Sequence, residues 1–351
     1  MKNGLVRWGM IGCGAVAEVK SGPGFQKASG SALVAVMRRN RGLAEDYARR
    51  HGVPRAYDDA ERLLADPEVD AVYIATPPGT HAEYARRAAD FGKPAYVEKP
   101  MARHAPECDA MIEAFARAKR PLFVAYYRRA LPRFQAVRRL LQEGSLGDIA
   151  AVDYRLAAPN HRRTAGWRIA AEEAGGGHFL DMGSHVVDLI EFLFSPLEDI
   201  GGFAERSGPT GEVEDRVTMS FRVGAVPGQG LWDFASDDAA DVLTVTGALG
   251  TLRFSVFGDE PLIWDHSGKS EQLVHPNPPH VQQPLIQSVV DELLGRGTCP
   301  SSGDSARRAS AAMDAVLAGY YGGRDDPFWR RPETWPGRKG GGRARVESSA
   351  R

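Results

Sequence analysis

The sequence predicts an α/β protein with an N-terminal, doubly wound parallel sheet and a C-terminal α+β domain built on a large, open, mostly antiparallel sheet. An apolar run followed by a glycine turn opens the chain at residues 5–17. Up to residue 125, short apolar runs alternate with helical patterns, as in a parallel sheet covered by helices. Between residues 215 and 265, strand patterns follow one another without long helices, which is typical of an antiparallel sheet.

Length and composition narrow the function classes. The 351 residues, 43% hydrophobic and 25% charged, are typical of a globular protein of two domains. A net charge of −1 gives no indication of nucleic acid or of an anionic membrane as a partner, and no apolar run could span a bilayer. No signal peptide is recognised, and Cys13, Cys108 and Cys299 match no metal spacing. We therefore expect a reduced, cytoplasmic protein without a metal.

The first strand and the turn after it predict a dinucleotide site. Residues 5–11 form the strand, and Gly12, Cys13, Gly14, Ala15, Val16 and Ala17 follow as a G-x-G-x-x-A turn that opens a helix. The first glycine allows the tight turn, the second lets the backbone approach a pyrophosphate, and the alanine lets helix and strand pack closely. The helix N-terminus offers free N–H groups to the phosphates. A plain tight βα turn is the alternative.

The remaining elements follow from hydrophobic periodicity and turn residues. The first helix is expected to break at residues 21–24 and to resume through 28. In the first half we expect strands at 32–37, 56–57, 69–75, 95–97 and 122–126 and helices at 43–51, 59–65, 81–91 and 106–119. In the second half we expect helices at 132–143, 180–194, 282–295 and 304–321 and strands at 149–157, 215–223, 230–236, 241–247, 250–256 and 261–265.

Three segments result. We expect residues 1–125 to form the dinucleotide-binding domain with the doubly wound sheet, and residues 126–335 to form the α+β domain. Residues 336–351 form a Gly- and Arg-rich tail that is expected to be disordered.

Two charged residues, Glu98 and Lys99, follow the apolar run at 95–97, and Pro100 comes next. The carboxyl end of a strand is where open α/β sheets bind ligands. An ammonium at that place could polarise a substrate oxygen. The alternative is a solvated lysine at a strand end.

A second candidate group lies on the helix after Gly175–Gly177. Asp181 and His185 are four residues apart and share a helical face. A carboxylate beside an imidazole fixes its orientation, which suits a general acid/base that moves a hydroxyl proton. The alternatives are a surface pair, a helix cap or, with no third ligand at a defining spacing, a metal pair.

Other polar and aromatic residues are open to two interpretations. His81 begins a helix, where it could cap or pack as readily as contact a ligand. Trp167 could stack on a sugar or fill the core. Four basic residues could bind substrate hydroxyls or a carboxylate, or simply lie at the surface: Arg128, His161, Arg163 and Arg168.

Several of these stretches together resemble the Gfo/Idh/MocA oxidoreductases, the family of glucose–fructose oxidoreductase and inositol dehydrogenase. They are MIGCGAVAEV at 10–19, ATPPGTHAEYARRAADFGKPAYVEKP at 75–100, AGGGHFLDMGSHVVDLIEFL at 174–193 and TGALGTLRF at 246–254. The resemblance covers about residues 5 to 320. It implies that residues 1–125 are an NAD(P)-binding Rossmann domain and that residues 126–335 are an α+β substrate and oligomerisation domain. It implies that Lys99, Asp181 and His185 are the catalytic positions. It also implies NAD(P) lying across Gly12–Ala17, with Lys99, Thr76, Pro77, His81 and Glu98 near the cofactor.

This resemblance implies an NAD(P)-dependent oxidoreductase, a dehydrogenase or reductase acting on CH–OH groups. It would transfer hydride between nicotinamide and a hydroxyl or carbonyl carbon of a sugar, polyol or related small molecule. Its substrate would lie against Lys99, Arg128, His161, Trp167, Arg168, Asp181 and His185. Some members of the family are non-enzymatic NAD(P)-binding regulators, so the alternative is a sensor of the same fold.

The residues after the second strand predict NADP(H) as the preferred cofactor, with NAD(H) possible. Arg38, Arg39 and Asn40 stand where NAD-preferring domains place an acidic residue, and no carboxylate comes before Glu45. Guanidinium groups can bind a 2′-phosphate bidentately. The alternatives are that the arginines begin a solvated helix or that Arg38 stacks on adenine.

The strands of the second domain predict self-association. Apolar residues there exceed what one sheet face needs: Val217, Met219, Phe221, Leu231, Trp232 and Phe234. Large exposed apolar patches mark interfaces. We therefore expect a homodimer or homotetramer formed through residues 215–275, which agrees with the open sheet that the resemblance implies.

Overall fold

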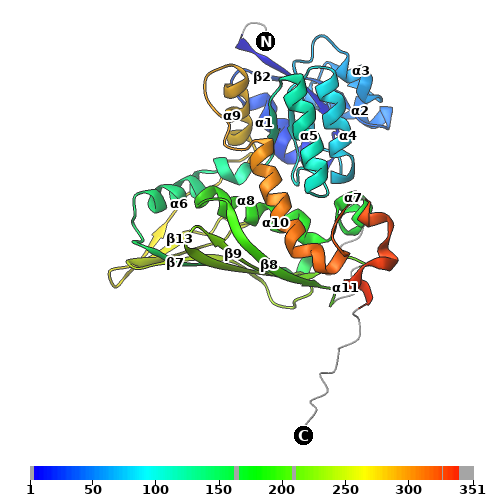
Figure 1. Cartoon of the computed structure of the whole chain (residues 1–351). Coiled ribbons are helices and arrows are strands. Elements are labelled where there is room, and N and C mark those ends of the chain that lie inside the picture. Colours follow the sequence, from blue (N-terminus) through cyan, green and yellow to red (C-terminus); the bar gives the residue numbers. More distant parts are fainter. Residues whose placement is uncertain (1–3, 162–165, 208–210, 326, 340–351) are drawn as a thin grey trace.

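The computed structural model describes residues 4–161, 166–207, 211–325 and 327–339. The chain forms two lobes, each built on one sheet (Figure 1). The predicted fold class is confirmed: a parallel α/β domain precedes a mostly antiparallel α+β domain.

The first sheet has six parallel strands in the order β3-β2-β1-β4-β5-β6. They are β1 (Val6–Ile11), β2 (Ser31–Met37), β3 (Arg55–Tyr57), β4 (Ala71–Ile74), β5 (Ala95–Val97) and β6 (Leu122–Val124). The strand order reverses between β1 and β4, and such a switch point opens a crevice at the carboxyl ends of the strands. The glycine turn after β1 and Lys99 after β5 both lie at this edge.

Helices of the first lobe connect these strands and cover the sheet. They are α2 (Arg41–His51), α3 (Ala60–Leu64), α4 (His81–Asp90) and α5 (Ala105–Ala118). The predicted break at residues 21–24 is wrong, because the chain stays helical through a π-turn (Ala17–Ser21) and α1 (Gly22–Lys27). Gly22 makes this possible, since a Cβ there would lie 2.4 Å from the carbonyl oxygen of Ala17.

The second sheet has eight strands in the order β14-β13-β12-β11-β7-β10-β9-β8, antiparallel except for the β7–β10 pair. They are β7 (Ile149–Ala157), β8 (Leu197–Glu205), β9 (Arg216–Val223), β10 (Val226–Asp233), β11 (Ala240–Gly247), β12 (Gly250–Phe254), β13 (Leu262–His266) and β14 (Lys269–Leu273). The sequence prediction omitted β8 and β14. Both are edge strands, and paired glycines in one and polar residues in the other leave no apolar alternation.

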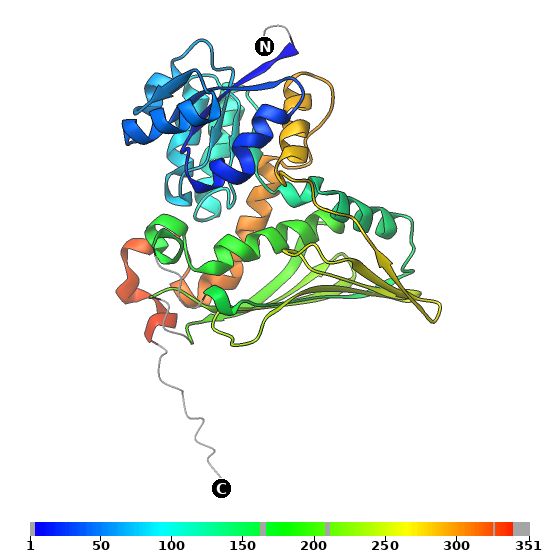
Figure 2. The same cartoon turned by 180° about the vertical axis from the view of Figure 1, so that it is seen from behind.

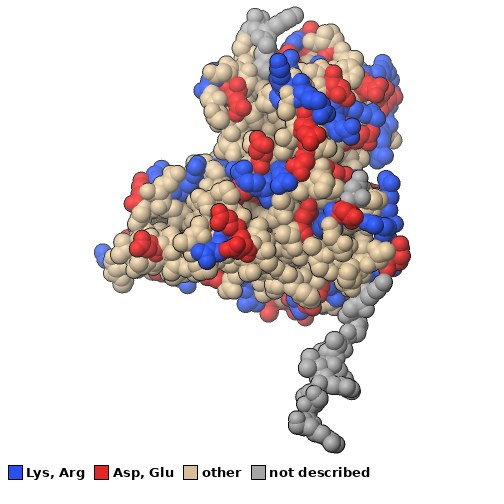
Figure 3. Space-filling model, in the orientation of Figure 1, with Lys and Arg blue, Asp and Glu red and all other residues tan. Residues whose placement is uncertain are grey.

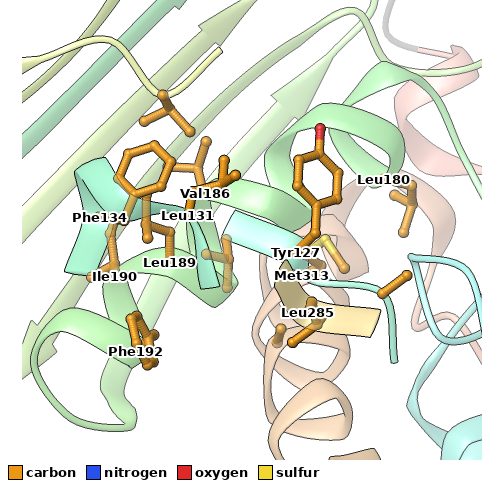
Figure 4. Close-up of a cluster of buried hydrophobic side chains, with 14 of the residues drawn as sticks. Tyr127, Leu131, Phe134, Leu180, Val186, Leu189, Ile190, Phe192, Leu285 and Met313 are labelled. Carbon is orange, nitrogen blue, oxygen red and sulfur yellow. The ribbon is translucent and has the colours of Figure 1, made fainter. Parts of the chain in front are cut away.

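Helices lie between the second sheet and the first lobe, and the opposite face of the sheet carries none in the described chain (Figures 1 and 2). These helices are α6 (Pro132–Gln142), α8 (Ser184–Leu193) and α10 (Gly303–Tyr321), whereas α9 (Gln283–Leu293) packs beside α1 in the first lobe (Figure 1). The shorter helices are α7 (Ala171–Ala174) and α11 (Pro336–Lys339). Figure 4 shows apolar side chains of α6 and α8, among them Phe134, Val186 and Ile190, packed in the core beneath the sheet.

Short 3₁₀ and π turns make up the remaining helical structure. They are Pro78–Thr80, Tyr127–Ala130, Pro159–His161, Trp167–Ile169, Phe328–Arg330 and Pro332–Thr334 as 3₁₀ turns and Phe179–Gly183 as a π-turn.

The apolar residues that predicted self-association lie almost entirely in the core. Strand β9 alternates strictly, and Val217, Met219 and Phe221 are buried under the helices while Thr218 and Ser220 face outward. Trp232 and Phe234 are buried as well, which leaves only Leu231 partly exposed. These residues therefore leave almost no apolar surface exposed, and the prediction of an interface from their number is wrong. Self-association stays a prediction.

The C-terminal segment differs from the predicted tail at its start. Residues 336–339 form α11, and Trp335 just before it is buried, so order extends past residue 336. Residues 340–351 lie outside the described part of the chain. No helix within the described ranges is long and apolar enough to cross a membrane, and the same residues hold no cluster of metal ligands. Figure 3 shows basic and acidic side chains intermixed on the face in view, with no field of one sign.

Candidate active site

A cavity of about 670 Å³ lies at the switch point of the first sheet, between the two lobes. Residues that follow β1, β2, β4 and β5 line it on one side, and the second lobe closes the other. Its lining includes the predicted residues Gly12, Gly14, Ala15, Val16, Arg38, Arg39, Thr76, Pro77, Glu98, Lys99, Arg128, Trp167, Arg168, Asp181 and His185.

The glycine turn forms a cradle at one end of the cavity. Gly12 has φ of 95°, and its N–H donates to the carbonyl oxygen of Met37 at 2.9 Å. A Cβ on Gly12 would lie 2.8 Å from the backbone of Ala75, whereas a Cβ on Gly14 would meet no atom within 4 Å. The backbone at Gly14 is thus open to a phosphate, which fits a dinucleotide. Ala17 is buried behind the turn, where it packs and does not line the cavity.

Basic residues follow β2 at the same end. Arg38 and Arg39 line the cavity with exposed side chains. Asn40 caps α2 through its Oδ1, which accepts from the N–H of Leu43 at 3.1 Å. Glu45, the first acidic residue after β2, pairs with Arg41 at 2.8 Å. The described wall at this end therefore presents guanidinium groups and no carboxylate.

Lys99 and Asp181 form an ion pair across the two lobes. The ammonium of Lys99 donates to Oδ1 of Asp181 and, at 2.9 Å, to its backbone carbonyl oxygen. Oδ2 of Asp181 lies 3.4 Å from Nε of Arg168. Burial raises the pKa of Asp181, but the charge of Lys99, its hydrogen bond and the charge of Arg168 together outweigh burial and lower the pKa to about 2. Asp181 is therefore ionised at any physiological pH.

The expected pairing of Asp181 with His185 is not formed. Residues 179–183 make a π-turn before α8 begins, so the four-residue spacing no longer stacks the two side chains as an α-helix would. Among the described residues no hydrogen bond joins them, and Nδ1 of His185 is buried without a partner. The carboxylate of Asp181, which the sequence spacing predicted to contact His185, pairs with Lys99 instead.

His185 lies in an aromatic setting and is 5% exposed. The rings of Tyr127 and Phe257 stand edge-on to it, with centroids 5.3 Å and 6.1 Å away. Burial first, and then the charges of Arg128 and Lys99, hold its pKa well below 6.5. His185 is therefore neutral at neutral pH and able to accept a proton.

Glu98 is buried and held by three donors. The hydroxyl of Tyr73 donates at 2.6 Å, Nε2 of Gln282 at 2.7 Å, and the N–H of Lys99 at 3.2 Å. Gln282 is the N-cap residue of α9, so its hydrogen bond ties the start of that helix to the strand end that carries Lys99. The Lys99–Pro100 peptide bond is cis.

Three predicted site residues do not line the cavity. His81 is fully buried, with Nδ1 3.0 Å from the carbonyl oxygen of Pro100 and Nε2 2.7 Å from that of Thr76, so it braces the wall from behind. His161 packs against His178 and Phe234. The third is Ala17, described above, and Arg163 lies outside the described residues.

Sequence reasoning missed other residues of the lining. They are Lys20, Met37, Leu43, Ala75, Pro78, Tyr84, Tyr127, Met182, Phe257 and Gln282. Tyr127 could have been found, because it follows β6 just as Lys99 follows β5. Phe257 and Gln282 carry no local signal, since only tertiary folding brings them to the cavity.

Comparison with known proteins gives the same architecture. Residues 6–126 match the family model described as "Oxidoreductase family, NAD-binding Rossmann fold", and residues 134–259 match "GFO/IDH/MocA C-terminal domain". "Oxidoreductase P35" of Formosa agariphila is 37% identical over 314 residues, which make up 88% of this chain and 97% of that protein.

Two solved structures share the fold at low sequence identity. Levoglucosan dehydrogenase in complex with NADH and levoglucosan has a TM-score of 0.81 at 21% identity, over 89% of this chain and 96% of that one. KijD10, a 3-ketoreductase from Actinomadura kijaniata in complex with NADP and TDP-benzene, has a TM-score of 0.80 at 21% identity, over 90% and 98%.

Proposed function

Because this chain belongs to the Gfo/Idh/MocA family of nicotinamide-dependent CH–OH oxidoreductases, we propose that it interconverts an alcohol and a carbonyl group on a sugar, a polyol or a related small molecule, with NADP(H) as the preferred cofactor. The observation that carries this is the convergence of Lys99, Asp181 and His185 at one end of a cavity whose other end is the glycine cradle. Residues 1–125 would hold the cofactor, and residues 126–335 would supply most of the substrate wall.

The chemistry needs a hydride and a proton to leave the same CH–OH group. Bound nicotinamide supplies the acceptor for the hydride, which departs from the carbinol carbon with its bonding electrons. His185 takes the hydroxyl proton, and the carbon–oxygen bond becomes double. In the reverse direction His185 returns the proton. Its lowered pKa keeps the imidazole neutral at neutral pH, and the neutral imidazole is the form that can accept the proton.

Lys99 would stabilise the substrate oxygen as charge develops on it. Its ammonium lies at the carboxyl end of β5, 14% exposed, and the contacts to Asp181 fix its position. A charge held in place in a water-poor cavity stabilises an oxyanion without reorganising. Asp181 is thus a positioning residue for Lys99. This role replaces the orientation of His185 that the sequence predicted.

The cofactor preference rests on Arg38 and Arg39. Both neighbouring structures use the same fold, one with NADH and one with NADP, so the fold alone allows either cofactor. In this chain two exposed guanidinium groups at the cavity edge support recognition of the 2′-phosphate. Asn40 would be secondary, since its Oδ1 already caps α2.

The test is the absorbance of reduced nicotinamide with a panel of sugars, sugar acids, polyols and dihydrodiols. We expect turnover on at least one of them. His185→Ala should lose about a hundred- to ten-thousandfold in turnover and keep cofactor affinity, while Arg139→Met, on the exposed face of α6, serves as the unaffected control. Full activity in His185→Ala would refute the assignment. Tight cofactor binding without turnover on any compound would favour a sensor.

A further inference from the structure

Arg128 differs from the other buried arginines of the second lobe. Arg129 pairs bidentately with Asp188, and Arg324 pairs with Asp314. Arg133 donates to the backbone carbonyls of Gly258 and Glu260. Arg128 is 5% exposed, yet within the described chain it makes one hydrogen bond, from Nε to the carbonyl oxygen of Val256 at 3.0 Å.

The guanidinium of Arg128 is nevertheless held firmly. The Phe257 ring lies 4.5 Å from its central carbon and the Tyr127 ring 5.0 Å, so two aromatic rings flank it. Nη1 is buried without a partner. Its two terminal nitrogens are therefore positioned but unused, and buried donors in native proteins are normally paired.

The nearby acid does not neutralise Arg128. Asp241 in β11 accepts from the Tyr154 hydroxyl at 2.9 Å, the Phe257 N–H at 2.6 Å and the Val256 N–H at 3.2 Å, and also from the Ser255 hydroxyl. Its oxygens are fully used in holding the loop that flanks Arg128. No ion pair to Arg128 occurs among the described residues.

The charges around the catalytic end leave a positive excess. The acids that line the cavity are Glu98, which is held by its own three donors, and Asp181, which is shared by Lys99 and Arg168. Nothing in this described lining balances Arg128. A buried unpaired charge is costly, so its retention indicates that a ligand provides the counter-charge.

The position of Arg128 identifies which ligand this is. Tyr127 and Phe257 contact both Arg128 and His185, so the guanidinium lies beside the proton-transfer group. The glycine cradle follows β1, and Arg38 and Arg39 serve that end. An anion at Arg128 would therefore belong to the molecule that reacts, and the cofactor phosphates would be bound elsewhere.

We propose that the substrate carries a carboxylate, as in a uronic or aldonic acid, and that Arg128 binds this carboxylate through its two terminal nitrogens. The proposal rests on the proposed oxidoreductase function and names its substrate class. A carboxylate matches the planar fork of a guanidinium held between two rings. A phosphate would call for further donors. Arg38 and Arg39 serve the cofactor end, and of the remaining described basic residues in this lining only Lys20 is not paired with an acid.

Calorimetric titration of the full chain without cofactor tests this. The probes are matched pairs, D-glucuronate with D-glucose, D-galacturonate with D-galactose and D-gluconate with D-glucitol, together with glucose 6-phosphate. We expect the acid of at least one pair to bind about ten- to a hundredfold tighter than its neutral partner. Arg128→Met should abolish that preference, Arg128→Lys should keep part of it, and Arg139→Met should keep all of it. No preference for any acid, a preference that survives Arg128→Met, or tighter binding of glucose 6-phosphate would overturn the proposal.

Thermal unfolding without ligand gives a second readout. Arg128→Met removes an unpaired charge and one hydrogen bond, so its melting temperature should equal or exceed that of the wild type. Arg129→Met leaves Asp188 unpaired and should melt at a clearly lower temperature. If both variants lose the same stability, Arg128 is a structural residue and the proposal fails. Turnover on neutral sugars with no acid binding would overturn this proposal alone, whereas acid binding without turnover would overturn the oxidoreductase proposal alone.

Discussion

The Lys99–Asp181 pair yields a prediction that can be measured without a substrate. The variants are Lys99→Met, Asp181→Asn and the double variant, whose free energies of unfolding form a double-mutant cycle. The pKa of Asp181 falls from an ordinary value of 3.8 to about 2, which corresponds to about 2 kcal/mol at neutral pH. Burial opposes this shift and Arg168 supplies part of it, so the two corrections act in opposite directions and we expect a coupling of about 2 kcal/mol between Lys99 and Asp181.

The pH dependence has a definite sign. Because the folded pKa of Asp181 is depressed, its contribution is complete above the unfolded pKa, near 3.8, and is lost as the pH falls toward about 2. Urea unfolding at neutral pH and across that window should therefore show the coupling shrinking in acid. The exposed Arg41–Glu45 pair is the control, for which solvent screening predicts a much smaller coupling. A Lys99–Asp181 coupling no larger than this, or one that persists at pH 2, would refute the reasoning.

Three further predictions concern the cofactor, proton transfer and assembly. NADPH should bind wild type more tightly than NADH, and Arg38→Ala should remove most of the difference in fluorescence titrations; equal affinities in wild type would contradict the assignment. The plot of kcat/KM for oxidation against pH should show no inflection near 6.5, because burial and the charges of Arg128 and Lys99 keep the pKa of His185 well below that value; a break near 6.5 would exclude His185 as the buried base. Light scattering at micromolar concentration should give a dimer or tetramer mass, formed through the uncovered face of the second sheet, and a monomer mass would remove that prediction.

The first lobe was predictable because its signals are local. Three short segments each predict their place in the fold from a few neighbouring residues: the glycine turn, the apolar run before Lys99 and the arginines after β2. Parallel strands that are buried on both faces are apolar along their whole length. Their positions can therefore be predicted from the sequence, although the predicted ends differ from the observed ends by one or two residues.

The second lobe depends more on tertiary contacts. Strands β8 and β14 lie at sheet edges, where pairing with a neighbour fixes the backbone although the side chains show no clear period. The apolar residues of β9 were counted correctly, but the sequence does not show that helices α8 and α10 are large enough to cover them all. The interface argument failed for that reason.

At the candidate site, residue types were easier to predict than partners. Lys99, Asp181 and His185 do meet in one cavity. Their pairing was wrong because one π-turn, with a hydrogen-bonding pattern that no sequence spacing reveals, turns Asp181 toward Lys99. The sequence also could not predict that Arg128 has no acidic partner. Asp241 accepts hydrogen bonds from four donors that lie far from Arg128 in the sequence, and only the folded chain brings these groups together.

Transfer of deuterium tests the central claim most directly. The substrate found in the panel would be labelled with deuterium at its carbinol carbon, and the reduced cofactor formed by wild type would be analysed by mass spectrometry. If hydride leaves that carbon for nicotinamide beside His185 and Lys99, the reduced cofactor carries the label and the labelled substrate turns over more slowly. Reduced cofactor without deuterium would contradict the proposed reaction at this site.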